Sequence, residues 1–95
     1  MQLPQKKITY TVIAFQFDPV TDTDLVSTRQ EVHCSTLPEA QKIQEQLADN
    51  LIQEKVPFRS YIQERETYNI QVSKRNKAEQ YRVKKIHNFI EFTGD

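Results

Sequence analysis

One helix with clear boundaries separates two pairs of predicted strands, and this constrains the fold more than any other feature. Thr36 and Glu39 form a capping box, in which their side chains accept hydrogen bonds from backbone amides that a helix start leaves unpaired. Apolar residues then recur at spacings of three and four, at Leu37, Ala40, Ile43, Leu47 and Leu51. Pro57 ends the helix, because the residue before a proline avoids the helical conformation. The pattern predicts that this stripe faces the core and that the Gln, Glu and Asp side chains lie outside.

Two strands are predicted before the helix. Residues 8–17 are rich in β-branched and aromatic side chains and carry apolar residues on both faces, which indicates a central strand or a bulge near Val12. Asp18 and Pro19 open a polar turn, and residues 25–34 form a weaker strand whose less polar positions are even-numbered. Together the two segments predict a long hairpin.

Two strands and a second helix are predicted after it. Residues 58–64 and 67–73 read as strands, and the second alternates cleanly, which gives the sheet one wet face. Residues 76–92 alternate only briefly. Their better match is a helix, since Asn76 and Glu79 form a second candidate capping box and Gly94 follows as a stop signal.

The apolar stripe of this second helix is Val83, Ile86 and Ile90. The element order is then ββαββα. We expect a single α+β domain over residues 1–95, with a four-stranded, mainly antiparallel sheet and both helices packed on one face.

Charge is balanced in total but not along the chain. Thirteen Lys and Arg match thirteen Asp and Glu, yet residues 17–54 hold eight acids against two bases and residues 55–88 hold nine bases against three acids. Part of the acidic excess is explained by the helix cap and by turn chemistry. The basic segment 74–87 is the stronger functional feature, and its candidate contacts to nucleic acid or another anion are Lys74, Arg75, Lys77, Lys84 and Lys85.

The composition argues against an enzyme. Gly94 is the only glycine, and phosphate-binding loops, dinucleotide folds and nucleophile elbows need glycine where the backbone approaches a ligand. His33 and Cys34 are neighbours on a predicted strand and so point to opposite faces. With His87 they are still one ligand short of a closed zinc site unless a carboxylate joins them. We expect a buried cysteine, a surface histidine and no catalytic site, metal or cofactor.

The remaining expectations concern compartment and partners. A single cysteine is typical of a reducing compartment, and no signal peptide or membrane-spanning run is recognisable, so we expect a cytoplasmic protein. Residues 67–73 or 25–34, if at a sheet edge, can add a strand from another chain. Our leading hypothesis is therefore a non-catalytic binding or adaptor module that acts through a protein interface or self-association, with no small-molecule substrate. The alternative is a nucleic-acid-binding accessory protein that uses the basic segment.

Overall fold

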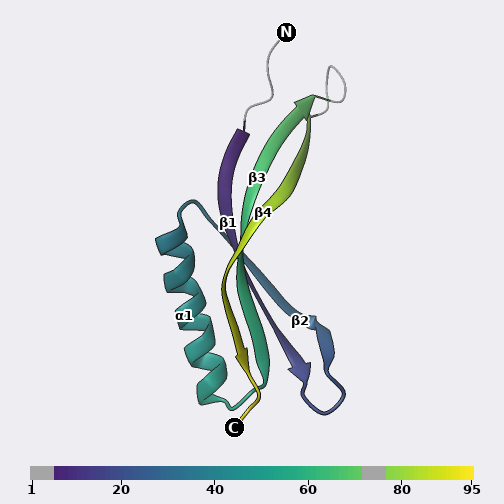
Figure 1. Ribbon diagram of the computed structural model, residues 1–95, viewed down its shortest axis with the longest axis vertical. Coiled ribbons are helices and arrows are strands. Elements are labelled where there is room, and N and C mark those ends of the chain that lie inside the picture. The colour runs from purple at the N-terminus through teal and green to yellow at the C-terminus, as the bar shows by residue number, and fades with distance from the viewer. Residues whose placement is uncertain (1–5, 72–76) are drawn as a thin grey trace.

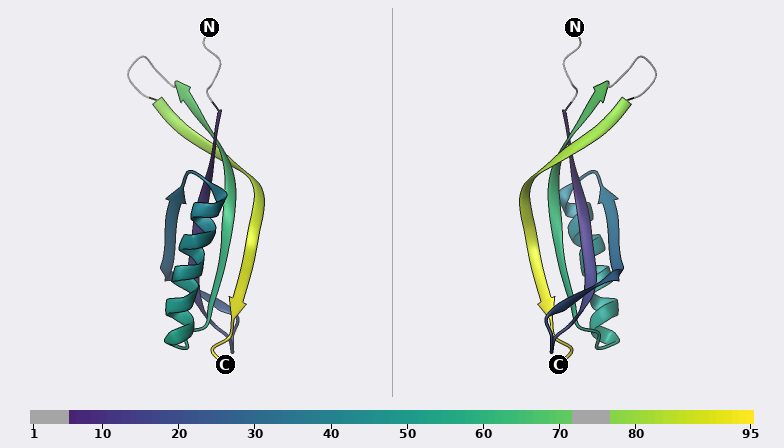
Figure 2. Two further views of the ribbon diagram at one scale, coloured as in Figure 1. Left: turned by 90° about the vertical axis from the view of Figure 1, so that its left-hand side faces the viewer. Right: turned by 90° about the vertical axis from the view of Figure 1, so that its right-hand side faces the viewer.

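The computed structural model describes residues 6–71 and 77–95. Its elements are β1 (Lys6–Asp18), β2 (Thr23–Cys34), α1 (Leu37–Gln53), β3 (Phe58–Gln71) and β4 (Lys77–Phe92). The strands form one antiparallel sheet in the order β2-β1-β3-β4. The helix α1 lies on one face of this sheet (Figures 1 and 2). The α+β class and the four-stranded antiparallel sheet are confirmed, whereas the predicted order ββαββα is wrong, because the described residues form one helix in the order ββαββ.

The segment predicted as a second helix is β4, and two bulges explain the error. Pairing with β3 runs from Val83 to Lys85 without a partner for Lys84, and from His87 to Ile90 across Asn88 and Phe89. Each bulge adds one residue to the strand, so side chains on one face recur at a spacing of three instead of two. That spacing imitates a helix.

The third and fourth predicted strands are one continuous strand. β3 runs through residues 65 and 66 without a break, and both of these charged residues are buried, at 7% and 6% exposure. The predicted number of four strands is therefore correct, but the fourth strand is β4 and not the second half of β3.

β1 is central, as its two apolar faces predicted. Thr11, Val12, Ile13 and Ala14 are all buried along it. The predicted bulge lies slightly further along, where pairing with β2 shifts between Ala14 and Gln16.

The helix α1 begins as the capping box predicted. The Thr36 hydroxyl accepts a hydrogen bond from the Glu39 backbone amide at 3.3 Å. The helix ends at Gln53, before Pro57, and Lys55 takes a positive φ of 57° in the turn.

The predicted apolar stripe does face the sheet. The core cluster on this face joins Val12, Cys34, Ala40 and Ile62, and the partly buried side chains packed against it are Tyr10, Val32, Leu37, Ile43 and Leu47. The most buried helix positions, however, are Ala40, Gln44 and Ala48. Small side chains at two of these positions let the helix approach the sheet closely.

The helix covers only part of the sheet. The far ends of β3 and β4, where these strands connect, extend beyond α1 (Figure 1). The overall dimensions of 56 × 27 × 19 Å reflect this extension. The opposite face of the sheet carries no helix of the described chain (Figure 2).

Candidate binding surface

The outer edge of β4 combines free backbone with exposed apolar side chains. Within the described residues β4 pairs only with β3, so its other side is an open sheet edge. Four of its large side chains are well exposed: Tyr81 at 55%, Val83 at 40%, Ile86 at 47% and Phe89 at 61%. An open edge offers backbone donors and acceptors to an added strand. We call this edge with its four side chains the β4 edge.

The second open edge is β2, which contains the predicted edge segment 25–34. It is less regular than β4, because pairing with β1 jumps from Gln30 to Leu25. In this gap the Thr28 hydroxyl accepts a hydrogen bond from the Gln16 backbone amide at 2.9 Å. In the other segment considered as an edge, residues 67–73, Thr67 and Tyr68 are not at an edge, since each pairs with both β1 and β4.

The predicted basic contacts are distributed along β4 and its connection to β3. Lys74 and Arg75 lie outside the described residues, and Lys77 is the first residue of β4. Lys84 and Lys85 are exposed at the middle of the strand, one in a bulge and the other opposite Glu64. The structure thus places Lys84 and Lys85 on a strand and not on the predicted second helix.

A cluster around Glu66 holds the uncovered half of the sheet together. The Glu66 side chain is only 8% exposed, and its carboxylate lies 3.0 Å from the Arg82 guanidinium and 3.6 Å from Lys6 Nζ. A hydrogen bond from the Tyr68 hydroxyl and then the contact with Arg82 hold the pKa of Glu66 below its usual value. The carboxylate therefore stays charged at neutral pH and links β1, β3 and β4.

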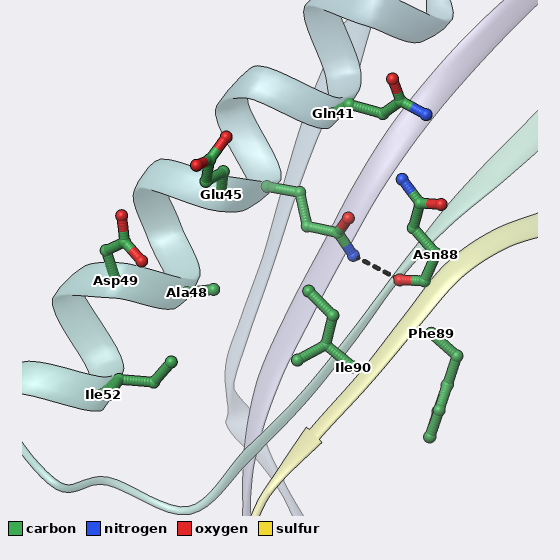
Figure 3. Close-up of a pocket in the computed structure, with 9 residues that line it drawn as sticks. Gln41, Glu45, Ala48, Asp49, Ile52, Asn88, Phe89 and Ile90 are labelled. Carbon is green, nitrogen blue, oxygen red and sulfur yellow. Dashed lines mark hydrogen bonds between the residues drawn. The ribbon is translucent and has the colours of Figure 1, made fainter.

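Gln44 links α1 to the sheet through a buried polar network. Its side-chain amide donates to the Asn88 carbonyl at 2.8 Å (Figure 3). The same amide donates to the Ser60 hydroxyl at 3.1 Å, and this hydroxyl donates to the Ile13 carbonyl at 2.8 Å. Asn88 lies in a β4 bulge with a positive φ of 53°. The prediction that the helix glutamines all lie outside is wrong for Gln44, because a hydrogen-bonded polar group can be buried at little cost.

A groove of about 460 Å³ lies between α1 and β4. Glu45 and Asp49 line it from the helix, and Ile90 lines it from the strand (Figure 3). Phe89, at the rim, points away from the helix (Figure 3). One wall of the groove is thus acidic, and the groove runs beside the open β4 edge.

A smaller hollow of about 270 Å³ lies where β2 ends. Lys7, His33 and Arg65 line it together with hydroxyl side chains. The Arg65 guanidinium is already engaged, since it lies 4.1 Å from the Tyr81 ring and donates to Gln63. The hollow therefore has cationic walls, but the Arg65 guanidinium already contacts Tyr81 and Gln63.

Cys34 and His33 point apart, as predicted. Cys34 is 4% exposed in the core cluster, and burial, followed by the nearby Glu39 carboxylate, raises the pKa of its thiol. The His33 ring is exposed and lies with Nδ1 3.0 Å from the Thr11 hydroxyl. His33 therefore does not activate the thiol.

Residues 6–71 and 77–95 contain no group of three or more His, Cys, Asp or Glu side chains placed to hold a metal ion. In this described part, no helix has the length and apolar character needed to cross a membrane. No model of a protein family matches the chain, and comparisons with curated proteins and with solved structures also give no match.

Some residues of the β4 edge could be identified from the sequence, but the pattern placed them on a helix. Val83 and Ile86 were expected on the buried stripe of a helix, yet both are exposed on β4. Gln44 was missed entirely. The sequence signal that could have identified residues 77–92 as a bulged strand is the early loss of alternation after Val83, which marks the first bulge.

Proposed function

We propose that the protein is a non-catalytic binding module that takes up a strand of a partner chain along the β4 edge. The observation that carries this proposal is a 16-residue edge strand with four exposed, large apolar side chains. Added strands gain affinity from backbone hydrogen bonds and specificity from alternate side chains. The single glycine supports a module without catalysis, and the single, buried cysteine supports an intracellular location.

Selection from a displayed library of random 12-residue peptides tests strand addition. We expect enriched peptides that alternate apolar and polar residues, and we expect their affinity to fall at least tenfold in Ile86→Lys. This change places a charge on an exposed position, so the fold should tolerate it.

Val26→Lys is the matched control, because Val26 is a β-branched residue with 77% exposure on the other edge strand. Peptides that bind both variants equally, or bind only at β2, would contradict the proposal. So would a library without enriched peptides, combined with a wild-type protein that stays monomeric at high concentration.

Nucleic-acid binding is the second candidate, and the adjacent exposed Lys84 and Lys85 favour it. The predicted contacts Lys74, Arg75 and Lys77 belong to the same proposal. Fluorescence anisotropy with DNA and RNA should then show binding that weakens steeply with salt, with a log-log slope of about −3.6 for four contacts to B-DNA. Lys84→Glu with Lys85→Glu should abolish it. Absence of binding at about 100 μM protein in low salt, within the usual non-specific range, would reject this candidate.

A further inference from the structure

β4 is symmetric about Ile86. Its two bulges, at Lys84 and at Asn88, each begin two residues from this position. The exposed Val83 and Phe89 each lie three residues from it. A strand with this pattern matches a reversed copy of itself. We propose that the partner at the β4 edge is a second copy of the chain, paired antiparallel about Ile86 into a continuous eight-stranded sheet. This inference rests on the proposed function.

This register matches the two faces of the sheet along the strand. Tyr81 would lie opposite Glu91 of the copy, and within one chain these two residues pair with Thr67 and Arg59, on the face without the helix. Val83 would lie opposite Phe89, which points away from α1 (Figure 3).

The register about Ile86 also matches side chains on the face that carries α1. Arg82 would lie opposite Ile90 of the copy, and these residues pair with Glu66 and Ser60 in β3. A shift of one residue would bring side chains of opposite faces together and misalign the bulges. The register about Ile86 is therefore strongly preferred.

The apolar side chains of the edge would cover one another in this pairing. Ile86 meets Ile86 of the copy at the twofold axis, and Val83 meets Phe89 on each side of it. Cross-strand pairs of this kind are the unit of sheet stabilisation. A homodimer with closed twofold symmetry leaves neither β4 edge open.

Charge favours the same arrangement. Glu45 and Asp49 line the groove that Ile90 borders, and the pairing brings Arg82 of the copy next to Ile90. The Arg82 side chain is 68% exposed, although it contacts Glu66, so it is accessible to this acidic wall. Lys85 of the copy would lie opposite His87, whose ring is 2.9 Å from the Glu64 carboxylate. Complementary charges of this kind select the antiparallel orientation.

A disulfide at the twofold axis tests the register. Directly opposed residues of an antiparallel pair have Cβ atoms about 4.5–5.5 Å apart, close to disulfide distance. Ile86→Cys should therefore form a covalent dimer under mild oxidation. In Tyr81→Cys the two thiols would be about 27 Å apart, because positions 81 and 91 pair with Thr67 and Arg59, eight residues of strand rise from each other, and crosslinking should fall at least tenfold. The native Cys34 is buried and common to both variants. Equal crosslinking of the two variants would overturn the register.

Sedimentation equilibrium between about 1 μM and 1 mM tests the dimer itself, because this range covers micromolar to millimolar dissociation constants. We expect a dimer whose dissociation constant rises at least tenfold in Ile86→Lys and several-fold in Glu45→Lys with Asp49→Lys, and is unchanged in Val26→Lys. A monomer that still binds selected peptides at β4 would overturn this inference and leave the proposed function standing. A dimer lost in Val26→Lys but not in Ile86→Lys would overturn both.

Discussion

At the scale of single residues, Gln44 is a buried polar side chain that ties the helix to the sheet. It is 2% exposed and joins the helix to β3 and, through the Asn88 carbonyl, to β4. The bulge makes this possible, because it turns a β4 carbonyl toward the helix and away from the regular ladder. The bulge and the buried glutamine are therefore a pair of features that depend on each other.

Gln44→Ala should destabilise the protein by about 1–3 kcal/mol, because it removes the donor that the Asn88 carbonyl and the buried Ser60 hydroxyl share. Gln41→Ala is the control, since Gln41 is an exposed glutamine one turn earlier and should change stability by less than about 0.5 kcal/mol. Urea unfolding followed by circular dichroism measures both. Equal losses in the two variants would show that the network contributes nothing specific.

Glu66 should make stability depend on acidic pH. Its pKa is lowered in the folded protein, so the carboxylate contributes stability above its unfolded pKa of about 4.3, and this contribution is lost as the pH falls through the folded pKa. Glu66→Gln should therefore be less stable than wild type at pH 7, and the gap should narrow toward pH 3. Unfolding curves at several pH values measure the gap. A constant gap would contradict the role of the charge.

At the scale of elements, α1 could be predicted and β4 could not. The capping box, the apolar spacing and Pro57 are local signals, and all of them act within α1 and its ends. The fate of residues 76–92 depends instead on pairing with β3, which lies earlier in the chain. Two bulges gave the strand the apolar spacing of a helix. The candidate site depends in the same way on residues that are distant in the sequence. The pattern identified Val83 and Ile86 as apolar residues of an amphipathic element. Whether they are buried depends on which strands pair beside β4, and local patterns do not reveal this.

The bulge at Asn88 yields a prediction for the strand as a whole. Its φ of 53° lies in the left-handed region, which asparagine and glycine tolerate and β-branched residues do not. Asn88→Val should cost about 1–2 kcal/mol, whereas Asn88→Gly should leave stability nearly unchanged. Thermal unfolding compares the two variants. Similar stability for both would mean that the strand repacks without the bulge.

At the scale of the whole molecule, acidic side chains of the β1–β2 turn are paired with an arginine at one end of the long axis. The β1–β2 turn, the end of α1 and the C-terminus lie at one end, and the start of β1 lies at the other (Figure 1). At the first end Arg59 binds Asp22, Asp24 and Glu91, which ties the turn to the last residues of β4. Much of the acidic excess is thus used within the fold, while Lys84 and Lys85 remain exposed near the middle of the open strand.

Backbone amide chemical shifts, followed by NMR from dilute to concentrated protein and on addition of selected peptides, test the central claim that the β4 edge is the binding surface. We predict that amides of residues 81–91 shift under both conditions while those of β2, the other open edge, stay constant. Shifts confined to Thr23–Cys34, or the absence of shifts on either edge, would contradict it.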